Sequence, residues 1–416
     1  MYSLRELYRI GMGPSSSHTI GPSTIARMFR EEYPDMKFFK VFLFGSLGAT
    51  GKGHFTDKAI ETVLAPHKVE FVWQPEVVLT RHTNAMRIEG FKHESDKKPM
   101  CSKLYYSIGG GAVIEDGKDD TIQHVYPDNR MRDIQRFCNE NNISLPEYVE
   151  KYEGVEIWDF CKEIWDTMNA CIDRGLNATQ KYLPAALLLE RKAPRVFKTA
   201  MEESNPIVKN DALASAFALA VSEENASMGV MVTAPTCGSA GVLPGVLRYA
   251  QEVYNLPEET ILKGLAVAGI IGLLAKHNAS LSGAEVGCQG EIGVSTSMAA
   301  AAMCYFLGGT TDQIERAAEI AMEHSLGLTC DPIGGFVMIP CIERNANATL
   351  RAIHTASYAK VLAGSYRISY DEILHTMYET GLDMNAGYKE TSIDGLAKYY
   401  DKLLDEDMKR REQLLY

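Results

Sequence analysis

The chain has 416 residues, of which 46% are hydrophobic and 23% are charged, so it can bury a large core and divide into two or three domains. Its formal net charge of −12 argues against nucleic-acid and membrane partners, because a negative field repels both, and favours a small-molecule partner. The first ten residues, MYSLRELYRI, carry charges and no long apolar run, which is not typical of a signal peptide. We therefore expect a cytoplasmic globular protein.

The first part of the chain alternates between strand and helix patterns. KVFLFGSL, which starts at Lys40, predicts a short buried strand, followed by a glycine-rich turn and a helix that begins near Thr56 and Asp57. Three strand-like runs follow: VEFVW, AMRIEGF and KLYYSIGGGAVIEDG. These elements predict an α+β domain over residues 1–128, and the polar residues 129–156 are interpreted as a connector.

Strand patterns nearly disappear after residue 156, and helical spacing with alanine-rich interiors takes over. We expect a nearly all-α domain over residues 157–398 and a charged C-terminal tail over residues 399–416. Two stretches, GLAVAGIIGLLAKHNASLSG and STSMAAAAMCYFLGG, look apolar enough for a membrane, but their apolar runs fall short of the roughly 20 residues of a spanning helix. Both are predicted to be buried, closely packed helices.

The nine cysteines are odd in number and scattered, which argues against a disulfide framework. Cys288, Cys330 and Cys341 each stand near glycine or proline, in loops whose backbone N–H groups can point at sulfur, as around an iron–sulfur cluster. For any one of them, a small buried side chain is the alternative. None has the close cysteine partner typical of structural zinc. Three thiolates on a cubane cluster would leave one iron open as a Lewis acid.

The segment IGMGPSSSHTIGPS, residues 10–23, concentrates hydroxyl side chains and a histidine between two Gly-Pro steps. A solvated surface turn is one interpretation. The other is a turn that opens a helix and offers hydroxyl groups and backbone N–H donors to a substrate carboxylate.

Several motifs resemble, in order and over nearly the whole chain, those of the iron–sulfur-dependent L-serine dehydratases in their single-chain form. They are GPSSSHTIGPS, FGSLGATGKGHFTDKA, SIGGGAV, TAPTCGSAGVLPGVL, GAEVGCQGEIGVSTSMAAAA, CDPIGGFVMIPCIERNANA and MNAGYKETSIDGLA. The resemblance implies an α+β N-terminal domain followed by a larger, nearly all-α domain carrying an iron–sulfur cluster. It also implies dehydration and deamination of L-serine to pyruvate and ammonia, with a [4Fe–4S] cluster held by Cys288, Cys330 and Cys341, and we expect a homodimer.

Site residues follow from the same motifs. The catalytic candidates are His18, His54 and Lys52, and Glu285 and Glu291 are further candidates for the base. Arg344 and Asn345 either bind a carboxylate or hold the Cys341 loop. The residues expected to bind substrate are Ser15, Ser16, Ser17, Thr19, Thr236, Gly238, Arg344 and Asn345.

The sequence departs from the family pattern at its end. Many single-chain relatives carry a cysteine close to the C-terminus, whereas no cysteine follows Cys341 here. The open iron would then be left to water, to another side chain or to Cys237. Two other functions stay open: a lyase of the same mechanism acting on threonine or cysteine, and a non-catalytic iron–sulfur sensor of amino acids.

Overall fold

A computed structural model describes residues 1–118, 124–184, 187–362, 366–398 and 400. By their internal contacts, the residues form two compact units. The α/β unit is Gly11–Ile122, and the helical unit combines Met1–Ile10 with Gln123–Tyr416. The predicted tail, residues 399–416, lies outside the described residues except for Tyr400.

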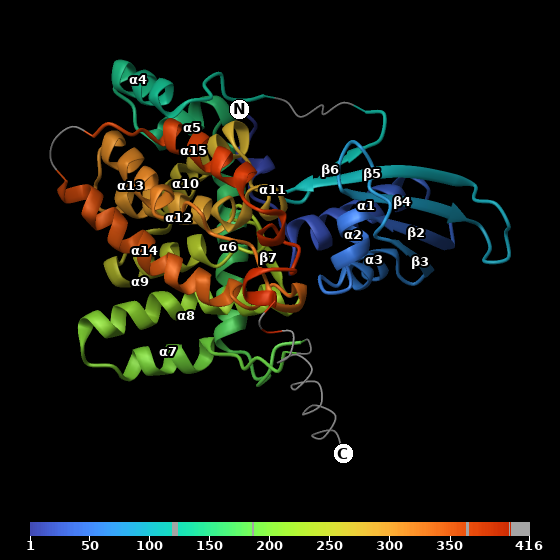
Figure 1. The fold of residues 1–416 in the computed structure, drawn as a ribbon. Helices are drawn as coiled ribbons and strands as arrows, with labels where there is room; N and C mark the ends of the chain where they lie inside the picture. The colour runs from blue at the N-terminus through green and yellow to red at the C-terminus, as the bar shows by residue number, and fades with distance from the viewer. Residues whose placement is uncertain (119–123, 185–186, 363–365, 399, 401–416) are drawn as a thin grey trace. The chain divides into compact units, whose positions relative to one another are not determined.

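The α/β unit is built on a five-stranded sheet with the strand order β3-β2-β4-β5-β6 (Figure 1). Strands β2 and β3 run parallel, and the other neighbours run antiparallel. The elements are β1 (Ile10–Met12) at the unit boundary, the π-helix η2 (Ser16–Ile20), α1 (Gly21–Glu32), β2 (Phe38–Phe44), α2 (Gly45–Thr50), α3 (Thr56–Leu64), β3 (Lys68–Gln74), β4 (Asn84–Phe91), β5 (Cys101–Gly109) and β6 (Ala112–Glu115).

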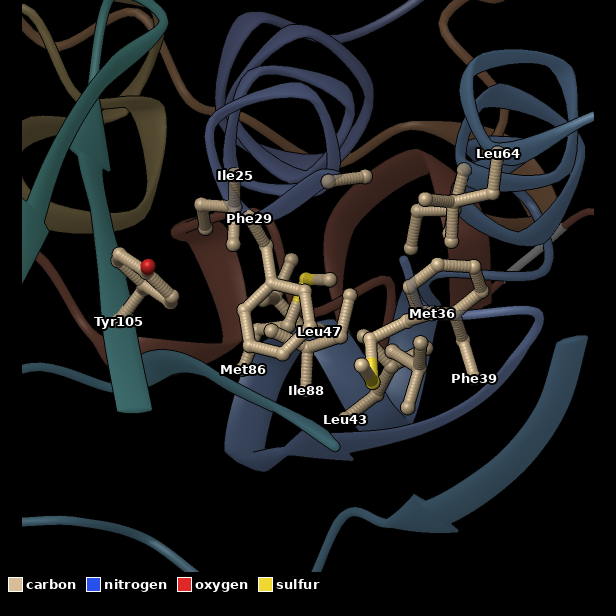
Figure 2. Packing of buried hydrophobic residues seen from close by; sticks show 13 residues of the cluster. Ile25, Phe29, Met36, Phe39, Leu43, Leu47, Leu64, Met86, Ile88 and Tyr105 are labelled. Carbon is tan, nitrogen blue, oxygen red and sulfur yellow. The ribbon is translucent and has the colours of Figure 1, made fainter. Parts of the chain in front are cut away.

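One face of this sheet forms the core of the unit. Alternate residues of a strand point to the same face, so Leu43 of β2 and its register partner Met86 of β4 both point inward. Figure 2 shows Phe29 of α1 and Leu64 of α3 in the same buried cluster. The period-two pattern of FFKVFLF therefore supplies the sheet side of the core, and the amphipathic helices α1 and α3 supply the other side.

The helical unit contains short helical turns and long helices packed side by side (Figure 1). Its elements are η1 (Leu4–Glu6), α4 (Met131–Asn141), α5 (Leu145–Glu153), α6 (Ile157–Leu176), α7 (Ala193–Glu202), α8 (Pro206–Ala226), β7 (Val230–Val232), α9 (Val242–Tyr254), α10 (Glu258–Asn278), α11 (Gly283–Val286), η3 (Gly287–Gln289), α12 (Ile292–Phe306), α13 (Thr311–Glu323), η4 (Ile333–Gly335), α14 (Cys341–Val361), α15 (Tyr370–Asp383) and η5 (Ala386–Tyr388).

Helices α10 and α12 carry the two apolar stretches, and both are buried along nearly their whole length. Small residues permit this close packing: a Cβ at Gly264 would come within 2.2 Å of the Phe306 ring, and one at Gly269 within 2.3 Å of Leu4. Among the described residues, no helix combines the length and the apolar character needed to cross a bilayer. The prediction of buried, closely packed helices is confirmed.

The predicted fold class, a small α+β region followed by a larger, mostly helical one, is confirmed. The structure adds four elements: the residues after β2 form helix α2 where a turn was expected, residues 129–156 contain helices α4 and α5, and a short strand, β7, lies in the helical unit. The expected domain bounds stay a prediction, and the first ten residues group with the helical unit.

Candidate functional site

The three cysteines singled out in the sequence lie in the helical unit, each in or near a helical element. Cys288 is in η3, Cys330 precedes η4, and Cys341 is the first residue of α14. The residue before Cys288, Gly287, adopts a φ of +71°, and a Cβ there would lie 2.7 Å from the carbonyl oxygen of Leu328. The backbone before Cys288 therefore requires glycine. All three cysteine side chains are buried.

A short backbone ladder fixes Cys330. Its N–H donates to the carbonyl of Tyr388 at 2.7 Å, and its carbonyl accepts from the N–H of Glu390 at 2.7 Å. The motif MNAGYKETSIDGLA, which contains these partners, therefore supports the cysteine loop from a distant part of the sequence.

The sulfur atoms of Cys288 and Cys330 converge with a carboxylate. One ligand atom each from Cys288, Glu291 and Cys330 lie within 4.8 Å of one another. Oε2 of Glu291 lies 4.0 Å from the Sγ atom of each cysteine. Such a group of sulfur and oxygen atoms is able to hold a metal ion.

Electrostatics ties Cys341 to the same group. Hydrogen bonding with Cys288 and burial raise the pKa of the Cys330 thiol well above its usual value. Burial and the proximity of Cys288 likewise raise the pKa of Cys341. Cys288, Cys330 and Cys341 thus form one buried cluster, called here the thiol cluster, in which the proximity of Cys288 raises the pKa of Cys330 and of Cys341.

Arg344 is the cation of the thiol cluster. Burial lowers its pKa, but the neighbouring thiols of Cys288 and Cys341 outweigh that effect and raise it. The guanidinium also donates to the carbonyl of Thr329 and lies 3.6 Å from a carboxylate oxygen of Asp331. It is therefore placed to offset negative charge on sulfur.

Asn345 joins the loop of residues 233–241 to helix α14. Its Oδ1 accepts from the N–H of Gly241 at 2.9 Å, and its Nδ2 donates to the carbonyls of Gly238 at 2.8 Å and Cys341 at 2.9 Å. In the same loop, the Thr236 hydroxyl donates to Oε1 of Glu291 at 2.6 Å. These contacts favour the scaffolding interpretation of Asn345, with its amide engaged on three sides.

In the α/β unit, the serine-rich segment forms the π-helix η2, which Ser15 caps by accepting from the N–H of His18 at 3.1 Å. The Ser17 hydroxyl lies 2.8 Å from Nδ1 of His18, and the Thr19 hydroxyl donates to the carbonyl of His54 at 2.8 Å. Within the part of the chain that the structure describes, no protein hydrogen bond is found for the nearly buried Ser16 hydroxyl.

The structure brings His18 and His54 together. Both rings are buried and their centroids lie 4.6 Å apart. Burial and the neighbouring His54 lower the pKa of His18 well below its usual value, and burial lowers the pKa of His54 to about 4. Lys52 is not part of this pair: it is exposed, and its Nζ lies 5.5 Å from the centre of the Trp73 ring.

Ser46 completes the polar site of the α/β unit, and the sequence did not single it out. Its hydroxyl lies 3.0 Å from Nε2 of His18. The signal was present, since Ser46 stands in the motif FGSLGATGKGHFTDKA, but spacing alone does not show which histidine it meets.

The remaining cysteines lie on other elements: Cys101 begins β5, Cys138 is in α4, Cys161 and Cys171 are in α6, and Cys304 is in α12. Cys237 is buried with its sulfur 3.8 Å from Sδ of Met231. Glu285 accepts from the Ser280 hydroxyl at 2.6 Å.

The chain thus has a serine-rich turn with buried histidines in one unit and a thiol cluster in the other. Comparison with known proteins identifies the class to which it belongs. The family model "Serine dehydratase beta chain" matches residues 3–71, and "Serine dehydratase alpha chain" matches residues 88–397. The chain belongs to the serine dehydratase family.

Curated relatives match over almost their whole length. The chain is similar to "L-serine dehydratase" of Streptomyces coelicolor, with 40% identity covering 95% of this chain and 98% of the relative. It is 39% identical both to "L-serine dehydratase" of Haemophilus influenzae and to "L-serine dehydratase 1" of Escherichia coli, over 95% of this chain and 99% of each relative.

Proposed function

We propose that the chain is an L-serine ammonia-lyase that removes water from L-serine and releases pyruvate and ammonia. The family match and the names of the relatives support the substrate and the reaction. The observation that carries the chemistry is the convergence of the buried Cys288 and Cys330 sulfur atoms with a Glu291 carboxylate oxygen within 4.8 Å, because sulfur and oxygen atoms that meet in this way are ligands for a metal ion.

The residues fit an iron–sulfur cluster. Cys288, Cys330 and Cys341 would hold a [4Fe–4S] cluster as thiolates, and Arg344 would compensate part of their charge. When bound, such a cluster supplies a Lewis acid for the substrate's β-hydroxyl. Asn345 and Thr236 keep the surrounding loops in place, through their bonds to Gly238 and Glu291.

The serine-rich segment is proposed to bind the amino-acid substrate. Ser15, Ser17 and Thr19 already have protein partners, whereas the Ser16 hydroxyl has none among the described residues. Ser16 is therefore the hydroxyl of this segment best placed to donate to a carboxylate.

His18 is proposed to move the proton. A lowered pKa keeps its imidazole neutral at neutral pH, so one ring nitrogen has a lone pair that can accept a proton. Ser17 and Ser46 hold the two ring nitrogens at 2.8 Å and 3.0 Å and so fix the ring. The His54 ring lies beside it, tilted by 37°, and Lys52 is the alternative base.

Protein purified without oxygen tests the proposal. We expect iron, acid-labile sulfide, a brown absorption spectrum and pyruvate formation from L-serine, with less from L-threonine and L-cysteine. Turnover of threonine or cysteine above that of serine would select the alternative lyase, and a full cluster without turnover of any of the three would select the sensor. A colourless, iron-free and active enzyme would refute the cluster chemistry.

The assembly is proposed to be a cytoplasmic homodimer without nucleic-acid or membrane partners, in line with the net charge of −12. Light scattering should give twice the mass of one chain.

A further inference from the structure

Glu291 is the carboxylate that stands inside the thiol cluster. It is partly buried, and only one of its carboxylate oxygens accepts a hydrogen bond from a hydroxyl group among the described residues. Oε1 accepts from the Thr236 hydroxyl at 2.6 Å, and Thr236 is itself held 3.1 Å from the Ser239 hydroxyl. This anchor fixes the carboxylate plane and leaves Oε2 directed at the sulfur atoms.

Oε2 has only sulfur neighbours as hydrogen-bonding partners. Among the described residues, no N–H or hydroxyl donates to it, and its contacts are the Sγ atoms of Cys288 and Cys330, each at 4.0 Å. A carboxylate oxygen that faces two sulfur atoms in a partly buried position lacks a strong donor, and a metal ion is the partner that would satisfy it together with two thiolates.

Two glycines keep the space around this carboxylate open. A Cβ at Gly283 would lie 2.7 Å from Oε2 and 3.2 Å from Sγ of Cys330, and a Cβ at Gly238 would lie 3.2 Å from Oε1. A side chain at either position would therefore crowd the carboxylate, so the two glycines leave it room.

Other side chains are placed less well for this role. The sulfur of Cys237 contacts Sδ of Met231 at 3.8 Å, and Glu285 is engaged by Ser280. Of the carboxylates near the three cysteines, Glu291 is the one whose oxygen lies within 4.8 Å of two sulfur atoms among the described residues.

We propose that Glu291 is the fourth protein ligand of the metal cluster, binding through Oε2 at the iron that Cys288, Cys330 and Cys341 leave open. The inference rests on the proposed function, because it needs the cluster to be present. A carboxylate is a harder ligand than a thiolate and suits exchange with an oxygen ligand such as a substrate hydroxyl. The substrate class implied is a β-hydroxy compound that competes with Glu291 for one iron.

Glu291→Gln is the matched test, because the amide keeps an oxygen for Thr236 and replaces Oε2 by an NH₂ group that does not ligate iron. After anaerobic reconstitution with iron and sulfide, we expect about four irons per chain in the wild type and about three in Glu291→Gln, with the EPR signal of an oxidised three-iron cluster. Glu285→Gln is the control and should keep about four. Glu291→Cys should restore the fourth iron with an altered Mössbauer spectrum.

A measurement on the wild type avoids any folding defect of the variants. In ¹⁷O-labelled water without substrate, ENDOR of the reduced cluster should show no strong ¹⁷O coupling, because the carboxylate fills the site. A strong coupling would overturn the inference, as would an unchanged iron content and spectrum in Glu291→Gln, while leaving the proposed function intact. If the wild type binds no iron at all, the proposed function fails first.

Discussion

Both units bury polar groups, but they stabilise them differently. In the α/β unit, the buried His18 ring has a hydroxyl within 3.0 Å of each nitrogen, Ser17 on one side and Ser46 on the other. In the helical unit, burial and the neighbouring Cys288 raise the pKa of the Cys330 and Cys341 thiols, and no strong hydrogen-bond donor faces Oε2 of Glu291 among the described residues. The first arrangement is complete with protein atoms alone, whereas the second favours an ion.

Because of this difference, we expect the polar site of the α/β unit to form when the chain folds and the thiol cluster to be completed only when it binds metal. Neutral imidazole with hydroxyl partners needs no ligand to be stable, so the α/β unit should keep its polar site in the apo state. The thiol cluster must lose protons when it binds metal, so its affinity should rise with pH. Each of the following substitutions acts on one side of this comparison.

The largest effect is expected for Cys330→Ala. Loss of a group that only supports a metal ligand typically lowers affinity or activity about 10–100-fold, so loss of a ligand should lower turnover by more than about a hundredfold. Bound iron should fall in parallel, measured colorimetrically on anaerobic protein. The control Cys304→Ala removes an equally buried thiol from α12 and should keep iron and turnover. Full iron in Cys330→Ala would remove this residue from the ligand set.

His18→Asn should lower turnover about 100-fold, the lower end of what a positioned proton-transfer group contributes. Iron content should not change, because the substitution lies in the α/β unit. Steady-state kinetics and iron analysis on the same preparation check both statements. A larger loss in Lys52→Ala than in His18→Asn would transfer the role of base to the lysine.

Acid should destabilise the α/β unit through its histidines. The pKa of His54 is about 4 in the fold, below its usual value of 6.5, so the unfolded chain binds more protons between these values. This contribution to stability is present above pH 6.5 and is lost as the pH falls toward 4. Calorimetry should show a decrease of at most about 3 kcal/mol, and His54→Asn should flatten the profile. A wild-type profile as flat as that of the variant would contradict the prediction.

The helical unit should respond in the opposite direction at Glu319 of α13. Burial and a hydrogen bond with Glu323 raise its pKa to about 7. The ion pair with Arg316 at 2.6 Å lowers the pKa but does not outweigh these two effects. Its stability contribution is therefore present below pH 4.5 and lost as the pH rises through 7. Glu319→Gln should raise the unfolding temperature more at pH 8 than at pH 5. Glu252→Gln, which breaks an exposed ion pair with Arg248 of the same length, should show no such trend.

The sequence patterns predicted the elements in which local and tertiary preferences agree. The alternation in β2 and β4 and the alanine-rich helices are of this kind. Helix α2 was missed because GSLGAT is rich in glycine, and its helical form depends on packing against β2, β3 and β4. Helix α5 could have been predicted from the sequence, since Ser144 and Glu147 form a capping box at its start. Its polar composition suggested a connector instead.

The sequence predicted which residues belong to the candidate site, but not how they are arranged in space. Glycine and proline around Cys288 and Cys330 marked both residues, although they are 42 positions apart in the sequence. Glu291 was noted as a possible base because it follows Cys288 closely. Its position near both sulfur atoms depends on the loop packing and on Thr236, which no local pattern encodes.

The smallest effect is expected at Cys237, which lies between an apolar side chain and a charged one. Its sulfur contacts Sδ of Met231, and burial followed by the charge of Glu291 raises its pKa well above the usual value. Cys237→Ser places a hydroxyl in this apolar position and should reduce stability by about 1–3 kcal/mol. Because the sulfur faces Met231, iron content and the absorption spectrum should stay unchanged. Cys304→Ser, at another fully buried thiol, should produce a similar loss of stability. A changed spectrum with unaltered stability in Cys237→Ser would instead make Cys237 a ligand and would weaken the assignment of Glu291 to the same position.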